Sequence, residues 1–446
     1  MTQTASAPAP TPRPTHNASP KAPTTSQRPQ TPLSRRAGPA RAPLPTPTVL
    51  RLVAVLAVVV ALVCGLVGWE AGRRQANALD QVSTSAERLL AAQEVRNQMV
   101  AADAVVTNGF LVGGLEPASS REEYARLIDG AAQGLGRLSF PDKDDTERVA
   151  RATAALTNYV ALVEQARSAN RQGLPVGIGY LDQASAELRQ TLLPELDALV
   201  ESGADHAADD FDQVANAPWL LMLVLLGLGV LVTVQAWDSR RTHRIVNTGL
   251  AGASLALLVV LTTGVALIQV DGSAQDVRTG SYRSTLALSQ AVSQAYDAQA
   301  LESLTLIKQG SGGGYELAFA TATVEVERQL TRVSDLNAST GSYGLADQFE
   351  AWLVNHRQIR EKDDAGDWNA AVELALANGP YSSRAAFRTF VEAATDKAES
   401  YRTKTTEGLD SARTKANGGA WVAMAAGLVA APLAWWGLAQ RREEYQ

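Results

Sequence analysis

The chain has 446 residues, of which 46% are hydrophobic and 19% are charged, and its formal net charge is −6. This acidic balance, without a basic domain, argues against a nucleic-acid partner. The single cysteine, Cys64, excludes a framework of internal disulfide bonds.

Residues 1–48 form a segment dominated by Pro, Thr, Ala and Ser. Such a composition offers almost nothing to bury, so we expect a disordered tail. Its function stays open between a cytoplasmic docking arm, phosphorylated at Thr-Pro and Ser-Pro steps, and a solvated tail or lipid-surface tether.

Long apolar stretches follow the tail. Four windows contain no Asp, Glu, Lys or Arg: residues 52–69, 213–237, 245–270 and 416–440. About 20 apolar residues cross a bilayer as a helix, whereas core helices of soluble proteins are seldom apolar on every side. We therefore predict four transmembrane helices that cross a lipid bilayer, at residues 49–69, 217–237, 248–270 and 418–440.

Basic residues set the predicted orientation. Arg240, Arg241 and Arg244 lie in the short hairpin 238–247, and the tail has six Lys or Arg and no acid. Because Lys and Arg in short loops stay on the cytoplasmic side, we expect a multi-pass plasma-membrane protein with both termini in the cytoplasm, including the end segment 441–446. Tryptophans at the expected interfaces agree: Trp69, Trp219 and Trp421 outside, and Trp237, Trp435 and Trp436 inside.

The two remaining segments, 70–216 and 271–417, are each 147 residues long and more acidic than basic. Their periodicity is helical, and glycine- and proline-rich breaks divide each into four helices, with a lesser interruption at residues 365–366. We predict an all-α fold, in which each segment is an extracytoplasmic antiparallel four-helix bundle whose end helices continue into the spans. The equal lengths and two similar Asp-Ala helices, 99–114 and 294–310, suggest a tandem repeat.

Polar residues interrupt the apolar face of the predicted bundles. A coiled-coil stripe begins with Leu79, Val82, Ala86 and Leu89, but Gln93, Arg96 and Asp103 continue it. Asp297, Gln299 and Glu302 hold comparable places in the second segment. Because buried charge is costly unless paired, these positions are candidates for a ligand pocket; the alternative is that register drift carries them to a solvated flank. Further candidate cationic or polar contacts are Asn170, Arg171 and Arg189.

Small residues recur every four positions in the fourth span, at Gly419, Ala423, Gly427 and Ala431. Such a ladder allows close helix approach, either to a neighbouring span or to a second protomer in a homodimer. The alternative is that the span is simply rich in alanine. Pro432 is expected to kink this span, and Pro194 to bend the long helix before the second span.

No pattern typical of an enzyme is present. The four histidines are scattered without metal-ligand spacing, and no glycine-rich phosphate loop follows a strand. We expect no enzymatic activity, no cofactor and no metal. The absence of acids and bases within the spans also argues against an ion-coupled transporter.

Two stretches carry a family resemblance, "NRQGLPVGIGYLDQASAELRQTLLP" at 170–194 and "DAVVTNGFLVGG" at 103–114. They resemble the actinobacterial four-span membrane sensors of the GlnX type, and the order of tail, spans and outer segments is similar. The resemblance implies a partnership with a glutamine-binding lipoprotein outside and a Ser/Thr protein kinase inside. It also implies that external amino-acid availability is passed across the membrane.

The functional expectation is a transmembrane sensory relay that senses an external solute, or a solute-loaded binding lipoprotein, and signals to a cytoplasmic partner. On this hypothesis, Asp103→Ala alters signalling while membrane level and fold stay intact. The alternative is a non-switching structural or accessory subunit that scaffolds a transporter or envelope complex.

Overall fold

The computed structural model describes residues 46–112, 116–140, 142–214, 218–242, 247–336 and 344–443. The chain divides into the units Met1–Thr46 and Pro47–Gln446, and the helices described below belong to the second, with the first helix beginning at its border. Residues 1–45 of the predicted disordered tail, 1–48, lie outside the described residues, whereas residues 46–48 belong to the first helix, so the tail ends three residues earlier than predicted. Every regular element in the described ranges is a helix, which confirms the all-α prediction.

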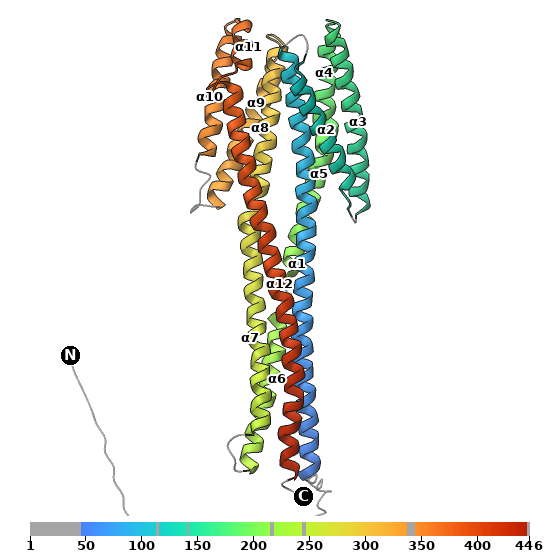
Figure 1. Ribbon diagram of the computed structural model, residues 1–446, viewed down its shortest axis with the longest axis vertical. Coiled ribbons are helices and arrows are strands. Elements are labelled where there is room, and N and C mark those ends of the chain that lie inside the picture. Colours follow the sequence, from blue (N-terminus) through green and yellow to red (C-terminus); the bar gives the residue numbers. More distant parts are fainter. Residues whose placement is uncertain are drawn as a thin grey trace, which may run out of the picture. The chain divides into compact units, whose positions relative to one another are not determined.

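The first half of the chain is a succession of long helices (Figure 1). They are α1 (Thr46–Val112), α2 (Ala118–Arg137), α3 (Lys143–Arg171), α4 (Val176–Glu187), the π-helical turn η1 (Leu188–Leu192), α5 (Leu193–Val214) and α6 (Pro218–Thr242). With 67 residues at a rise of 1.5 Å each, α1 is about 100 Å long, more than three times the hydrocarbon thickness of a bilayer.

The described part of the second half is also a succession of helices, with its π-helical turn early in the order rather than late. Its elements are α7 (Thr248–Val277), the π-helical turn η2 (Arg278–Tyr282), α8 (Arg283–Ile307), α9 (Gly313–Leu336), α10 (Leu345–Asp364), α11 (Trp368–Leu376) and α12 (Ser383–Glu443). The short helix α11 begins after the expected minor interruption, where Gly366 adopts a φ of 83°. Gly344 does the same at the start of α10, with a φ of 100°.

Local capping explains several helix boundaries. The Asp142 carboxylate accepts a hydrogen bond from the Asp144 amide at the start of α3, and Asp367 accepts one from Ala370 at the start of α11. Such caps satisfy amides that have no partner within the helix. Gly173, with a φ of 67°, and Pro175 separate α3 from α4.

The helices share a continuous series of hydrophobic cores. One core consists of residues from α1, α6, α7 and α12 in their apolar stretches. A second combines α1, α5, α7 and α12 around Leu79, Phe211 and Tyr282. Separate cores then form among α1 to α5 and among α8, α9, α10 and α12.

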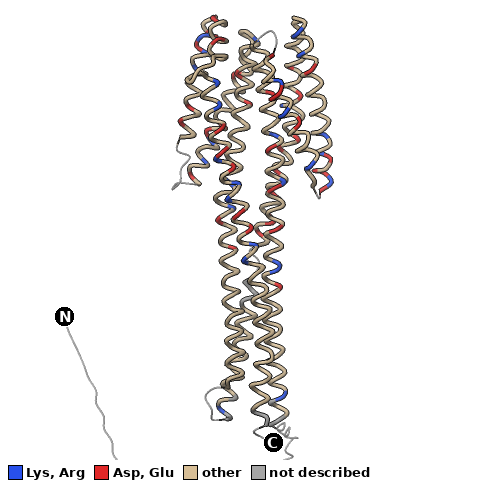
Figure 2. Tube along the Cα trace, in the orientation of Figure 1, with Lys and Arg blue, Asp and Glu red and all other residues tan. Residues whose placement is uncertain are grey.

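Three described helices are long and apolar enough to span a membrane: residues 51–112, 248–307 and 383–440. Each also runs on well past its apolar part, and Figure 2 shows a long stretch of these helices with few charged residues. A shorter apolar helix covers Met222–Trp237, within the second predicted span. These helices indicate a membrane protein.

The two outer halves pack against each other. The core of the first half includes Leu304, and Tyr296, Ile307 and Tyr315 of the second half pack on it. Figure 1 shows α1 and α8 in the centre of this region, with α3 and α4 to one side and α10 and α11 to the other. The two halves are predicted to form separate bundles, whereas in the structure they share a common face.

Candidate functional site

Asp103 lies at the centre of a buried polar network on α1. Its side chain is fully buried and accepts hydrogen bonds from Ser185 Oγ at 3.0 Å, Arg189 at 2.9 Å and Tyr159 Oη at 3.3 Å. These donors come from α3, α4 and η1, so the carboxylate joins three elements to α1. The network therefore satisfies a charge whose burial would otherwise be strongly unfavourable.

Arg189 extends this network to the second half of the chain. One of its terminal nitrogens contacts Asp103, and the other donates to Asp297 Oδ1 of α8 at 2.8 Å. Arg189 lies in the π-helical turn Leu188–Leu192, five residues before Pro194. Because a proline has no amide hydrogen and its ring clashes with the carbonyl four residues earlier, it favours a widened turn here.

Electrostatics keep the donors of the network protonated. Burial raises the pKa of the Asp103 carboxyl above its ordinary value, and the Arg189 charge and the Ser185 hydroxyl counteract that rise. Burial lowers the pKa of Arg189, but the Asp297 and Asp103 carboxylates outweigh this effect and raise it. Burial and the Asp103 charge raise the pKa of Tyr159 well above its ordinary value.

Other polar contacts cross the same face between the halves. Lys308 Nζ lies 3.1 Å from Asp182 Oδ2, and Tyr315 Oη also donates to Asp182. Asn97 donates to Ser289 Oγ at 2.8 Å. At the outer end, Arg384 of α12 donates to Asn108 of α1.

Arg96 and Gln93 are also buried, with 9% and 1% of their surface exposed, so neither lies on a solvated flank. Arg96 donates to Asp197 Oδ1 at 2.5 Å and to Ser293 of α8. Polar contacts between the two halves thus form one group, which we call the inter-half network. Its members are Arg96, Asp103, Arg189 and Asp297.

Glu302 belongs to a different cluster, formed by residues of α8, α9 and α10 in the second half. Its Oε2 lies 2.7 Å from His356 Nδ1, and Glu316 Oε1 lies 3.2 Å from His356 Nε2. The imidazole also stacks on Phe319, with 3.7 Å between ring centroids. Burial would lower the pKa of His356, but its hydrogen bonds to the two glutamates outweigh this and raise the pKa to about 9.

Asn170 and Arg171 lie apart from the inter-half network. They line a small cleft of about 20 Å³ near the end of α3, together with Glu116 and Arg167. The Arg167 guanidinium donates to Glu116 at 2.9 Å and to Glu164 at 2.8 Å, and lies over the Tyr124 ring. The structure therefore does not bring Asn170 or Arg171 together with Asp103.

The proposed topology residues lie at the end of α6. Arg240 is exposed there, and Arg241 is in the last turn of the helix. Arg244 falls outside the described residues.

The small residues of the fourth span lie against neighbouring helices of the same chain. A Cβ added to Gly427 would come within 2.5 Å of the Gly65 Cα of α1, and one on Gly419 within 3.1 Å of Thr263 of α7. Ala423 and Ala431 are buried.

Several members of these clusters were missed from sequence. No nearby sequence pattern marks them as site residues, because their hydrogen-bond partners lie 40 to 133 residues away in the chain. They are Tyr159, Ser185, Asp182 and His356. Asp103, by contrast, stands out in the sequence as a charged residue on the apolar stripe that begins at Leu79. No group of three or more His, Cys, Asp or Glu residues in the described part of the chain is arranged to hold a metal ion.

Comparison with known proteins gives one match. Searches of curated proteins and of solved structures found none. Residues 78–212, which run from the outer part of α1 almost to the end of α5, match the family described as the actinobacterial sensor domain. This match supports a sensory role.

Proposed function

We propose that the chain is a transmembrane sensory relay, which senses an external solute or a solute-loaded binding lipoprotein and signals to a cytoplasmic partner. The match of residues 78–212 to a sensor domain is the observation that carries this proposal. The relay has no catalytic step of its own, so its output depends on the partner. The resemblance to GlnX-type proteins suggests a Ser/Thr protein kinase for that role.

Helix continuity supports the relay. Helix α1 carries an apolar stretch at one end and Asp103 at the other without interruption. Helix α12 similarly joins an apolar stretch to Arg384. A helix that is continuous between a sensing region and a span transmits a shift or a rotation along its axis.

The inter-half network supplies a means of coupling. Arg189 binds carboxylates on α1 and on α8, and both helices continue toward apolar stretches. A change in the packing of the first half against the second therefore moves helices that lead to the membrane. Repacking of salt bridges at an interface is one of the ways in which proteins switch between two arrangements.

The orientation of the relay is part of the proposal. With four spans, the second including Met222–Trp237, the basic end of α6 and both termini lie in the cytoplasm. Residues 70–216 and 271–417 then face outside. The small-residue ladder of the fourth span gives no support for a homodimer, because Gly427 lies against Gly65 of the same chain.

The rival function is a scaffold that holds a transporter or envelope complex without switching. Capture of partners by the full-length protein in membranes separates the two. A relay retains a solute-binding lipoprotein to an extent that changes with the solute loaded on it. Solute-independent co-purification with a permease, and no solute-dependent capture, would contradict the relay.

A further inference from the structure

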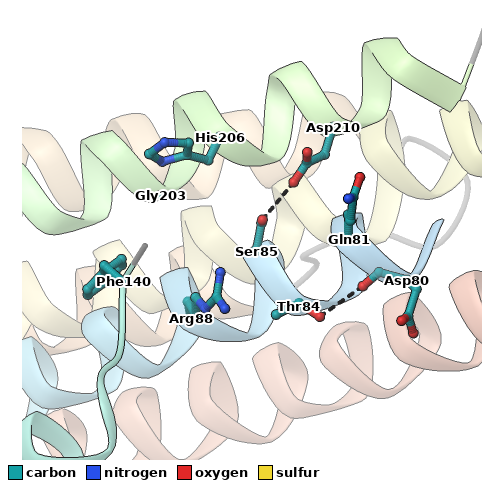
Figure 3. Close-up of a pocket in the computed structure, with 9 residues that line it drawn as sticks. All are labelled: Asp80, Gln81, Thr84, Ser85, Arg88, Phe140, Gly203, His206 and Asp210. Atoms are coloured by element: carbon teal, nitrogen blue, oxygen red, sulfur yellow. Dashed lines mark hydrogen bonds between the residues drawn. The ribbon is translucent and has the colours of Figure 1, made fainter. Parts of the chain in front are cut away.

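A pocket of about 300 Å³, lined mainly by polar residue types, lies between α1 and α5, apart from the inter-half network (Figure 3). Its lining comes from Asp80, Gln81, Thr84, Ser85 and Arg88 of α1, from Gly203, His206 and Asp210 of α5, and from Phe140 before α3. All nine positions fall within residues 78–212, the stretch that matches the sensor domain. The volume is at the lower end for small-molecule sites, which are typically about 300–1,000 Å³.

Arg88 is the most informative group in this pocket. Its side chain is half-buried, and Figure 3 shows it pointing from α1 toward α5. Among the residues that the structure describes, none forms an ion pair or hydrogen bond with its guanidinium. By contrast, the buried Arg96 and Arg167 and the half-buried Arg189 all contact carboxylates. A guanidinium whose donors are unused matches a carboxylate with two parallel hydrogen bonds.

The opposite wall offers an acceptor. Asp210 of α5 is half-buried and accepts a hydrogen bond from Ser85 Oγ through Oδ2 at 2.7 Å. Its second oxygen is available for a donor on a ligand, while the ring of Phe140 gives an apolar boundary on another side. The lining also includes a second carboxylate, Asp80, which pairs with Arg413 of α12 outside the pocket. Arg88 and Asp210 are therefore the opposite charges left to face a ligand, and a ligand bearing a carboxylate alone would leave Asp210 without a donor.

We propose that this pocket binds a small carboxylate that also carries a hydrogen-bond donor, an amino or a hydroxyl group. Arg88 holds the carboxylate, and Asp210 accepts from the donor group. The assignment rests on the proposed sensory function and deepens it, because it names the site and the chemical class of the solute.

The position of the pocket explains how such a ligand would act on the rest of the chain. Arg88 and Asp210 belong to different helices, so the ligand draws α1 and α5 together. Close by, Asp80 pairs with Arg413 of α12 at 3.0 Å. The ligand thus acts where three helices meet, adjacent to the core that combines α1, α5, α7 and α12.

Calorimetric titration of the purified full-length protein tests the proposal with two matched sets of probes. One set is alanine, lactate, propionate and ethylamine. The other is leucine, 2-hydroxy-4-methylpentanoate, 4-methylpentanoate and 3-methylbutylamine. In at least one set, the amino or hydroxy acid binds more tightly than the plain carboxylate, and the plain amine does not bind. Whether the amino or the hydroxy acid binds better identifies the source of the donor group.

Three variants locate the binding. Arg88→Gln weakens binding of the carboxylates at least about tenfold, as expected for loss of a charge-assisted bidentate pair. Asp210→Asn removes the advantage of the amino or hydroxy acid over the plain carboxylate. Arg126→Gln, on exposed α2 surface outside the pocket, leaves binding unchanged. Circular dichroism confirms that each variant is folded.

Two results would overturn the pocket assignment: no binding of any probe to the wild type at up to about 10 mM, or equal binding to wild type and a folded Arg88→Gln protein. These results are separable from failure of the relay. If probes bind through Arg88 but never change lipoprotein capture, the pocket stands and the relay fails. If capture depends on solute while no probe binds, the relay stands and the pocket assignment is wrong.

Discussion

At the scale of single residues, the Asp103 carboxylate accepts hydrogen bonds from three side chains, so its removal leaves Arg189 without one of its two carboxylate partners. We expect Asp103→Ala to destabilise the outer part of the protein by about 3–5 kcal/mol, the usual effect of breaking a buried ion pair. Thermal unfolding of the purified protein, followed by circular dichroism, measures the effect. Asp129→Ala, at an exposed position on α2, is the matched control.

The predicted loss of stability differs from the expectation from sequence that Asp103→Ala leaves the fold intact. The reason is that the sequence does not show that the Asp103 carboxylate is fully buried. For signalling experiments the milder Asp103→Asn, which keeps the size of the side chain and removes its charge, is the better variant. Equal melting temperatures for Asp103→Ala and Asp129→Ala would contradict the structural role of the network.

His356 predicts a pH dependence. Its pKa is about 9 in the folded protein and about 6.5 in an unfolded chain. A raised pKa gives stability that is fully present below pH 6.5 and is lost as the pH rises through 9. The shift corresponds to about 3 kcal/mol, and the side chain is only 6% exposed, so little of this is screened by solvent.

Unfolding experiments between pH 6 and 10 test this prediction. The wild-type protein should lose stability across the range, whereas His356→Gln should lose distinctly less. His206→Gln, on exposed surface of α5, is the control and should follow the wild type. If the His356→Gln protein showed the same pH dependence as the wild type, the imidazolium between Glu302 and Glu316 would not be its source.

The sequence predicted which positions were unusual better than it predicted their partners. The sequence marks Asp103, Arg189 and Asp297 as candidates, but it does not show that they contact one another. In the structure the Arg189 guanidinium binds Asp103, 86 residues away in the chain, and Asp297, 108 residues away. His356 was dismissed because no metal-ligand spacing surrounds it, and Glu302 lies 54 residues away. Arg88 gave no signal at all, because an arginine on a helix flank usually faces solvent.

At the scale of helices, the contact between α1 and α12 depends on two glycines. A Cβ on Gly65 would lie 2.6 Å from the Gly427 Cα, a distance that no side chain tolerates without movement of the backbone. Gly427→Val should therefore destabilise the purified protein by about 1–3 kcal/mol, the usual range for overpacking.

Gly418→Val is the matched control on the same helix, because nothing lies within 4 Å of the Cβ that would be added there. Melting temperatures of the two variants in the same detergent make the comparison. A Gly427→Val protein as stable as Gly418→Val would show that α1 and α12 do not approach this closely.

Helix boundaries were largely accessible from sequence, since glycine and proline act locally. The positive φ of Gly366 falls in the predicted interruption at residues 365–366. The widened turn at Leu188–Leu192 was not predicted as such, although Pro194 did mark a local disturbance. Neither periodicity nor composition distinguishes two separate bundles from two halves with a common face, because that choice depends on which flanks of α1 and α8 meet.

The proposed relay requires that both helical halves lie on the same side of the membrane. Only then can Arg189 contact both Asp103 and Asp297. Continuous helices then connect residues 78–212 and the proposed pocket to the apolar stretches. In the proposed relay, the cytoplasmic ends of these helices alter how a partner binds, and this step needs no catalytic domain.

Cysteine labelling in intact cells tests this arrangement most directly. The only native cysteine is replaced by Cys64→Ala, and single cysteines are introduced as Ala150→Cys, Ala351→Cys or Ser239→Cys; the two alanines are exposed, one in each half, and Ser239 is near the end of α6. A membrane-impermeant maleimide should label the Ala150→Cys and Ala351→Cys proteins in intact cells, and the Ser239→Cys protein only after lysis. Protection of either outer cysteine in intact cells, or labelling of the Ser239→Cys protein before lysis, would contradict the proposed relay.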